Sequence, residues 1–162
     1  MSDTETSAER VITSVAELKE LIGQELGVGE WLEVTQERVD AFADATGDHQ
    51  YIHVDPERAR GTFFGGTIAH GYLTLALIPE LSKSRSGVKI NLGGRMGVNY
   101  GLNKVRFPAA VRVGKRIRLR SKLLAVEEIG DRAIQMTSRQ TIEIEGEERP
   151  ACVAETVGCT YL

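Results

Sequence analysis

Hydrophobic side chains in the N-terminal part of the chain recur at helical spacing in two segments. The first, SVAELKELIGQELG (residues 14–27), has four apolar residues on one face, namely Val15, Leu18, Leu21 and Ile22. The second, QERVDAFADAT (residues 36–46), has Val39, Phe42 and Ala43 on one face. Thr35 is suited to cap this second helix, and Gly47 can end it in the left-handed conformation. The pattern predicts two amphipathic helices.

The segments around these helices are short and irregular. GEWLEV (29–34) is typical of extended chain, and residues 51–54 are expected to form a second extended piece. Asp55 and Pro56 suit a helix cap followed by the first helical position, which predicts a brief helical turn over PERAR. The stretch GTFFGG (61–66) predicts a glycine loop.

TIAHGYLTLALIPELSKS, which begins at residue 67, is the most hydrophobic segment in the chain. It has hardly any polar face before Glu80, and a helix that is apolar on all sides must be surrounded by other structure. Thr67 is suited to cap this helix, which puts His70 and Gly71 in its first turn. We therefore expect a buried helix over residues 67–82.

After about residue 86 the hydrophobic period changes from helical to alternating. KRIRLRSKLLAV (115–126) alternates strictly, as a half-buried strand does, and opposite its basic row it places Ile117, Leu119, Ser121 and Leu123. Three further segments are expected to be strands, namely MGVNYGLNKVRF (96–107), AIQMTSRQTIEI (133–144) and ACVAETVGCTYL (151–162). Gly130 and Gly146 are placed for hairpin turns.

These elements predict an α+β fold in which four strands form an antiparallel meander that wraps around the buried helix. The chain of 162 residues is long enough for one domain with its own core. We assign residues 13–162 to this single domain and expect residues 1–12 to be a disordered tail. The sheet edges and the apolar helix favour a homodimer that continues the sheet across a twofold axis.

The composition places the chain among globular proteins, with 41% hydrophobic and 27% charged residues. No apolar run is long enough to span a membrane, and the polar N-terminus lacks the features of a signal peptide. We therefore expect a cytoplasmic protein without a membrane partner. Cys152 and Cys159 are too few for a disulfide scaffold or a closed zinc site, and we expect two buried, reduced thiols.

Charge is strongly segregated along the chain. Residues 1–80 carry fifteen acids and five bases, whereas residues 81–126 carry twelve bases and no acid. This basic segment indicates either a positive face for an anionic partner or the solvated side of a strand. The strand residues in question are Arg116, Arg118, Arg120 and Lys122. Nucleic acid is not expected as a partner, because no aromatic residues interleave with the bases and the whole chain is acidic.

ATGDHQYIHVD (45–55) contains two of the three histidines in the chain. Its candidate metal ligands are Asp48, His49, His53 and Asp55. Because Gly47 ends the preceding helix, the two histidines lose the helical spacing that would bring them together, and no further nitrogen or sulfur ligand is at hand. We expect no metal here, and we expect His49 to face solvent or the rim of a substrate site. The third histidine, His70, is expected to pack in the first turn of the buried helix.

The order of these motifs resembles the MaoC-like dehydratase family, whose best-known members are R-specific enoyl-CoA hydratases (hydratase 2) with a hot-dog fold. The matching residues are Asp48, His53, Asp55-Pro56 and Ile68-Ala69-His70-Gly71. Hydratases of this type often have Asn-Pro where this chain has Gln50-Tyr51, and the loop at Gly66-Thr67 also lacks the usual proline. Both features resemble the branch named after nodulation protein N.

The resemblance implies that Asp48 and His53 hold the water that adds across the double bond of a 2-enoyl thioester. It also implies that the Gly71 N–H binds the thioester oxygen, where negative charge develops. The residue types suit this chemistry, because histidine can act as acid or base near neutrality and an ionised aspartate is a better water holder and base than acid. Which of the two delivers the final proton stays open. Glycine lets the thioester come close to a first-turn amide, which has no partner within a helix.

The resemblance further implies a lyase that carries out R-specific hydration or the reverse dehydration, with the acyl chain beside the central helix. It implies no cofactor beyond the CoA or carrier protein of the acyl thioester substrate. The candidates for contact with the CoA phosphates are Lys83, Arg85, Arg95, Lys104 and Arg106.

Two alternatives use the same fold. A hot-dog thioesterase usually needs a carboxylate on the central helix, where only Glu80 is present, near the far end. A non-catalytic module that binds acyl thioesters would not need Asp48, His53 and Gly71 together. Both alternatives are therefore less favoured than hydration.

Overall fold

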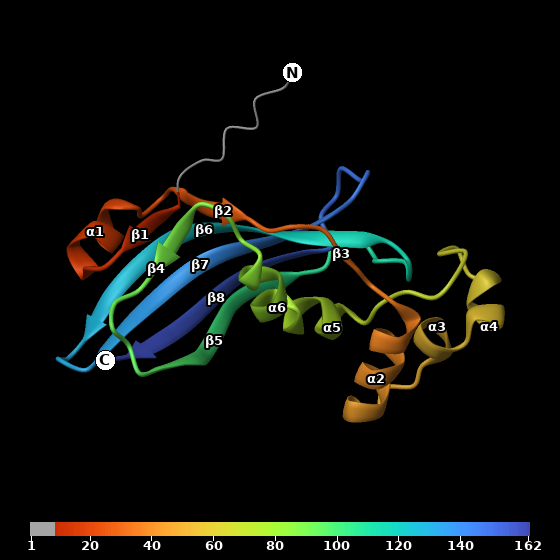
Figure 1. Cartoon of the computed structure of the whole chain (residues 1–162). Coiled ribbons are helices and arrows are strands. Elements are labelled where there is room, and N and C mark those ends of the chain that lie inside the picture. The colour runs from red at the N-terminus through yellow and green to blue at the C-terminus, as the bar shows by residue number, and fades with distance from the viewer. Residues whose placement is uncertain (1–8) are drawn as a thin grey trace, which may run out of the picture.

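A long antiparallel sheet with helices beneath it dominates the computed structural model, which describes residues 9–162 (Figure 1). The helices are α1 (Val15–Glu20), α2 (Gln36–Thr46), α3 (Tyr51–Val54), α4 (Pro56–Arg60), α5 (Gly71–Ala76) and α6 (Ile78–Lys83). The strands are β1 (Arg10–Ile12), β2 (Glu25–Val28), β3 (Leu32–Glu33), β4 (Val88–Ile90), β5 (Met96–Arg106), β6 (Arg116–Ile129), β7 (Ala133–Ile144) and β8 (Cys152–Tyr161). Helices α5 and α6 lie beneath the sheet, and α2, α3 and α4 lie together at one end (Figure 1).

The main sheet runs in the order β2–β6–β7–β8–β5, and β3 also pairs with β6. Strands β6, β7 and β8 form the predicted meander, with Gly130 and Gly146 in the left-handed region at the two turns. The prediction that β5 belongs to a meander beside β6 is wrong, because β5 pairs with β8 at the edge of the sheet. The connection from β5 to β6 crosses the end of the sheet instead of forming a hairpin, and the N–H of Val113 donates to the Thr67 carbonyl on the way (2.9 Å).

Helices α5 and α6 pack against the inner face of the sheet. The buried residues that meet there include Leu73, Leu77, Leu81, Ile117, Leu119, Ile142 and Ile144. The predicted helix over residues 67–82 starts too early, since helix α5 begins only at Gly71, and it is interrupted at Leu77, shortly before a proline. The residues before it follow an extended path because the N–H of Ala69 donates to the carbonyl of Val111 (2.8 Å).

A second core cluster packs α1, β1 and β4 against the sheet. Its buried members are Ile12, Leu18, Leu21, Leu26, Leu123, Val126 and Ile134. The expectation of a disordered tail is wrong for Arg10–Ile12, which pair with β4 in parallel because Ile12 is buried in this cluster. The rest of the predicted tail, residues 1–8, lies outside the described part of the chain.

The first two predicted helices have different outcomes. Helix α1 is shorter than predicted and ends at Glu20, because Gly23 (φ 86°) turns the chain toward β2. Helix α2 has the predicted bounds and caps. The Thr35 side chain accepts a hydrogen bond from the N–H of Arg38 (3.2 Å), and Gly47 has a φ of 79°.

The basic row of β6 lies on the outer face of the sheet and is paired with acids. Arg118 and Arg120 both bond to Glu143, at 2.6 and 2.9 Å, and Arg116 pairs with Glu145. These three arginines therefore line the solvated side of a strand, as the second interpretation of the basic segment predicts.

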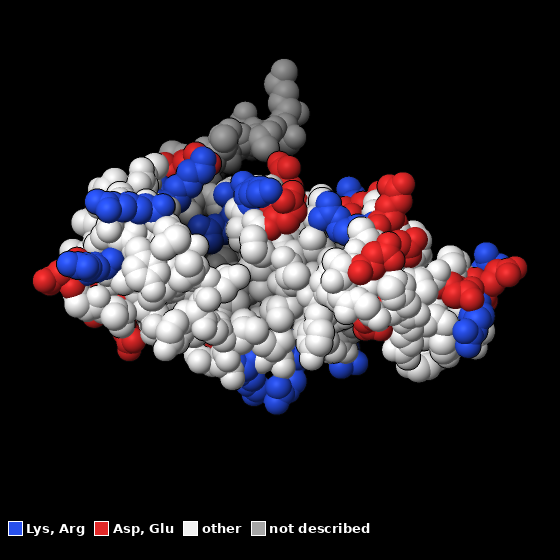
Figure 2. Space-filling model, turned by 90° about the horizontal axis from the view of Figure 1, so that it is seen from below, with Lys and Arg blue, Asp and Glu red and all other residues white. Residues whose placement is uncertain are grey.

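The face that carries α5 and α6 differs from this outer face. Seen from below in Figure 2, its centre is formed mainly by uncharged residues, with charged residues of both signs at its rim. The helices within residues 9–162 are all too short or too polar to cross a membrane.

Candidate active site

The turn between α2 and α3 positions Asp48 and His53. Asp48 follows Gly47 directly, is exposed, and accepts a hydrogen bond at Oδ1 from the N–H of Gln50 (3.3 Å). The extended piece predicted for residues 51–54 is instead helix α3, because the His53 N–H donates to the Gln50 carbonyl and closes a helical turn (2.9 Å). This turn brings the His53 side chain back toward Asp48.

His53 is buried, with 7% of its surface exposed. Its Nδ1 lies 2.7 Å from the carbonyl oxygen of Ile68. A carbonyl only accepts, so Nδ1 carries the hydrogen and Nε2 keeps a lone pair. Burial lowers the pKa of His53, and the hydrogen bond to Ile68, which favours the charged form, opposes that shift. The imidazole is therefore neutral at neutral pH and can accept a proton at Nε2.

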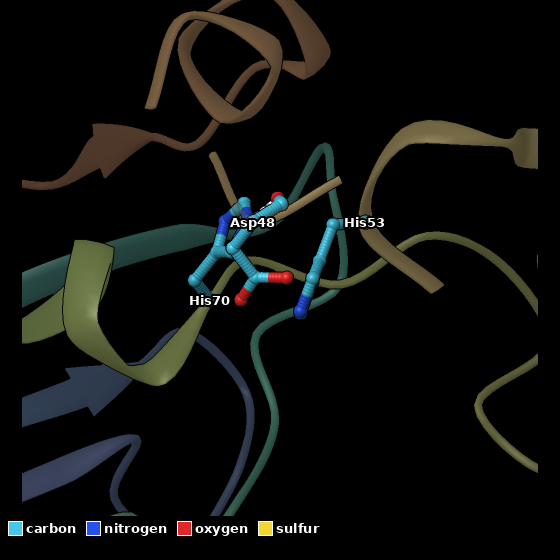
Figure 3. A group of neighbouring side chains, drawn as sticks. All are labelled: Asp48, His53 and His70. Atoms are coloured by element: carbon cyan, nitrogen blue, oxygen red, sulfur yellow. Dashed lines mark hydrogen bonds between the residues drawn. The ribbon is translucent and has the colours of Figure 1, made fainter. Parts of the chain in front are cut away.

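Asp48, His53 and His70 converge on one point. One oxygen or nitrogen atom of each side chain lies within 4.8 Å of those of the other two. Figure 3 shows the Asp48 carboxylate and the His53 ring directed toward each other. The structure thus brings together the two residues singled out in the sequence, at a separation that a single water molecule can bridge.

His70 touches both of these residues. It is the residue directly before α5, its Nε2 lies 3.0 Å from the backbone oxygen of Asp48, and only 3% of its surface is exposed. Its ring stacks on that of His53, with centroids 3.8 Å apart and planes 24° apart. The expectation that His70 packs in the protein interior agrees with this burial. The sequence did not indicate its contacts with the Asp48 backbone and the His53 ring.

Gln36, which the sequence did not indicate, ties the helices of the site together. Its Nε2 donates to the backbone oxygen of His53 (2.7 Å) and to Asp40 (2.9 Å). Its Oε1 accepts from the hydroxyl of Thr67 (2.6 Å), so this threonine holds Gln36 and does not cap a helix as predicted. A glutamine at the first position of a helix is common, so no sequence signal distinguished Gln36.

Gly71 is the first residue of α5, where a backbone N–H has no partner within the helix. A Cβ at this position would lie 3.1 Å from the ring of Phe107, closer than a normal contact. Glycine therefore keeps this amide approachable and allows Phe107 to pack against the start of the helix. The amide belongs to the residue that directly follows His70, a member of the converging group.

A groove of about 720 Å³ runs along α5 and α6 from Tyr72, the residue after Gly71. The helices contribute Tyr72, Leu75, Ala76, Ile78, Pro79 and Ser82. The opposite wall comes from β5, β7 and β8, with Asn99, Tyr100, Gly101, Leu102, Gln140, Thr156, Val157 and Gly158. The catalytic candidates do not line this groove, which begins just beyond them.

The four metal-ligand candidates of the 45–55 segment do not come together. His49 is exposed and pairs with Asp44 (2.8 Å), and the Asp55 side chain caps α4 by accepting from the N–H of Arg58 (3.1 Å). The group Asp48, His53 and His70 is closer, but its two imidazoles are stacked. Because each lone pair lies in its ring plane, one ion cannot meet both nitrogens in plane.

The fold and the site define a hot-dog protein of the dehydratase class, and comparison with known proteins identifies the family. The family described as MaoC like domain matches residues 17–145. The chain therefore belongs to the MaoC-like dehydratases, and the predictions of a hot-dog fold and of a lyase of the hydratase type are confirmed.

Two relatives are similar over nearly the whole chain. A protein named 3-hydroxyacyl-thioester dehydratase Z, from Mycobacterium tuberculosis, is 53% identical over 148 residues, which cover 91% of this chain and 96% of that protein. Nodulation protein N from Rhizobium leguminosarum bv. viciae is 47% identical and covers 89% of both chains. The resemblance to the nodulation protein N branch is thus confirmed.

Solved structures support the fold. The MaoC-like dehydratase from Rhodospirillum rubrum aligns with a TM-score of 0.69 at 21% identity and covers 89% of this chain and 95% of that one. The (R)-hydratase from A. caviae involved in PHA biosynthesis aligns with a TM-score of 0.64 at 26% identity. The alignment covers 85% of this chain and 94% of that one.

Proposed function

We propose that the chain hydrates trans-2-enoyl-CoA thioesters to (3R)-3-hydroxyacyl-CoA, or catalyses the reverse dehydration. The observation that carries this proposal is the convergence of Asp48 and His53 with His70, the residue directly before Gly71. The relative named as a 3-hydroxyacyl-thioester dehydratase supports the substrate class. The likeness to an (R)-hydratase supports the handedness.

In the hydration direction, the Asp48 carboxylate and His53 Nε2 hold one water molecule between them. The water oxygen bonds to C3 of the enoyl group as one of its protons passes to the pair, and the pair delivers a proton to C2. Neutral His53 is able to take up this proton, while the exposed Asp48 orients the water as a hydrogen-bond acceptor. Dehydration follows the same steps in reverse.

Negative charge develops on the thioester oxygen when the C3–O bond forms. The Gly71 N–H is the donor we assign to this oxygen, because it has no partner within α5 and directly follows His70, which converges with the pair. A preorganised donor of this kind typically lowers the barrier by about 2.7–4 kcal/mol.

The acyl chain fits the groove along α5 and α6, whose helical wall is mainly apolar. The CoA moiety then lies outside the groove, where cations are available for its phosphates. Of the five basic candidates, Lys83 pairs with Glu80 and Arg85 donates to the Val88 carbonyl (2.9 Å). Within residues 9–162, no carboxylate pairs with the remaining three, which are Arg95, Lys104 and Arg106.

We further propose a homodimer formed through β5. This edge strand is 11 residues long and almost wholly exposed. Four of its exposed side chains are apolar or aromatic, namely Met96, Val98, Tyr100 and Leu102. An unprotected edge with these side chains is suited to pairing with a second copy of the same strand.

The structure adds an argument against the thioesterase alternative. Glu80, the carboxylate it needs on the central helix, is exposed and does not line the groove. Its hydrogen bond with Lys83 lowers its pKa, so it is an ionised surface residue held by a neighbouring cation. A binding module would in turn leave the buried, neutral imidazole of His53 without a role.

One assay tests the proposal. The purified chain is mixed with trans-2-butenoyl-CoA, the loss of the conjugated absorbance is followed, and the handedness of the product is determined. Formation of (3R)-3-hydroxybutyryl-CoA supports the proposal. Release of free CoA with the double bond intact would point to hydrolysis, and binding without turnover would point to a binding module.

A further inference from the structure

His70 is the residue in the described chain that contacts both members of the candidate pair. Its Nε2 meets the backbone oxygen of Asp48 at 3.0 Å, and its ring covers one face of His53 at 3.8 Å. We propose that His70 is a positioning residue that keeps Asp48 and His53 at a constant separation while protons move between them. This inference rests on the proposed function and adds a third side chain to it.

The hydrogen bonds define how each imidazole is protonated. The backbone oxygen of Asp48 can only accept, so His70 carries its hydrogen on Nε2. Nδ1 of His70 is buried with no hydrogen-bond partner among residues 9–162. His53 has the opposite tautomer, with its hydrogen on Nδ1. One backbone carbonyl thus accepts a hydrogen bond from Nε2 of His70, and another accepts one from Nδ1 of His53, so the two stacked rings donate from different nitrogens.

The charged and titratable groups that face His70 are few. Asp48, just after the end of α2, and His53, in α3, each have a polar side-chain atom within 4.8 Å of one on His70. The third neighbour is the ring of Phe42 in α2, at 4.9 Å, which carries no charge. Two stacked imidazolium ions at 3.8 Å would repel each other, so the ring of His70 disfavours the charged form of His53.

The place of His70 in the chain extends this role. It directly precedes Gly71, whose amide we assign to the thioester oxygen. A shift of His70 therefore moves the water-binding pair and the amide relative to each other. Errors of about 1 Å in such geometry cost on the order of 100-fold in rate.

Three substitutions separate the two contacts of His70. His70→Gln keeps an N–H that can reach Asp48 but loses the stacked ring, His70→Phe keeps a ring but loses the donor, and His70→Ala loses both. We expect kcat for trans-2-butenoyl-CoA to fall on the order of 100-fold in His70→Ala and less in the other two, with KM changed less than about threefold. The exposed His49→Gln serves as the matched control and keeps the wild-type kcat.

The pH profile distinguishes positioning from a general loss of structure. Removing the second imidazole removes a neighbour that disfavours the charged form of His53, so the acidic limb of kcat/KM moves to higher pH in all three variants. Equal losses of kcat in the three variants with an unmoved limb would mean a structural role and would overturn the proposal. The proposal would also be overturned if all three variants had kcat values within twofold of the wild-type value.

A measurement on the unaltered chain covers variants that fail to fold. In protein labelled with ¹⁵N-histidine, nitrogen shifts are expected to show His53 as the Nδ1–H tautomer and His70 as the Nε2–H tautomer at pH 8. A His70 ring that carries its hydrogen on Nδ1 instead would overturn the proposal. Because these shifts do not depend on turnover, they still decide the matter if the chain hydrates no enoyl thioester.

Discussion

The Nδ1 atom of His53 lies 2.7 Å from the carbonyl oxygen of Ile68, fifteen residues further along the chain. This contact joins helix α3 to the extended segment that leads into α5. It also determines which nitrogen of the imidazole is available to a substrate, because the nitrogen that donates to a carbonyl cannot accept a proton. The reactive nitrogen is therefore Nε2.

Substitution of the pair is the first test of this geometry. Asp48→Asn removes the charge but keeps the shape, and His53→Ala removes the imidazole. Each is expected to lower kcat for trans-2-butenoyl-CoA on the order of 10²- to 10⁴-fold, the usual contribution of a general acid or base. His49→Gln, a change at an exposed histidine, is the control in the same absorbance assay. A variant of the pair that keeps more than a tenth of the wild-type rate contradicts the assignment.

The activity should persist to a lower pH than an ordinary histidine would allow. Burial lowers the pKa of His53, so the neutral ring that accepts the proton remains populated at a lower pH than that of an exposed imidazole. The acidic limb of kcat/KM is expected to have an apparent pKa below 6.5. A limb above 7 would contradict this expectation.

The same shift predicts how stability depends on pH. The folded pKa of His53 is below the unfolded value, so the unfolded chain binds more protons between the two values. The contribution of His53 is therefore fully present above the unfolded pKa, near 6.5, and is lost as the pH falls through the folded pKa. In urea titrations between pH 7.5 and 5, the wild type should lose more stability than His53→Gln. Equal losses would contradict the prediction.

Gly71 is expected to be sensitive to a single added methyl group. The Cβ of Gly71→Ala would press on the ring of Phe107 at 3.1 Å and obstruct the approach to the amide. We expect kcat/KM to fall at least tenfold, with the backbone N–H itself retained. Adding Phe107→Leu should recover part of the loss if the crowding against the ring causes it. No recovery in the double variant would assign the whole effect to the blocked approach.

The edge strand β5 predicts a self-association that can be measured directly. Light scattering on the purified chain is expected to give the mass of a dimer, and Val98→Asp, at a residue 38% exposed on β5, should shift it to the monomer. Ile129→Asp places the same charge at an exposed apolar residue at the end of β6 and should leave the dimer intact. A monomeric wild type, or a dimeric Val98→Asp, would rule out β5 as the interface.

Cys152 should be inert in the folded protein. It is fully buried and unpaired, and burial raises the pKa of its thiol to about 11. Because the thiolate is the reactive form, the Cys159→Ser variant should not react with a thiol reagent until it is unfolded in urea. Rapid reaction of the native variant would show that this part of β8 opens.

Local sequence signals predicted the parts of the site that depend on short-range geometry. Thr35, Gly47 and the Asp55 cap were identified because capping chemistry involves neighbours in the chain. The motif residues Asp48 and His53 were found as well, since their types and order are distinctive. Their approach to each other depends on helix α3, which was expected to be extended because a single helical turn leaves no periodic pattern.

The features that were missed depend on distant partners. Strand β5 was placed beside β6 because strands adjacent in sequence usually pair, yet it pairs with β8. The start of α5 was placed at Thr67, whose hydroxyl is instead bonded to Gln36, 31 residues earlier. The double role of His70 follows from contacts with residues 17 and 22 positions away, which spacing within a helix cannot reveal.

Phe107 links the start of α5 to the end of β5. Its ring rests against Gly71, and it follows directly on β5, the strand we propose as the seam between two copies. Assembly of that seam would restrain the ring and with it the entrance to the catalytic centre. Dilution would then separate the two copies and lower the specific activity before any unfolding occurs. Turnover per molecule would rise with enzyme concentration until all of the protein is dimeric.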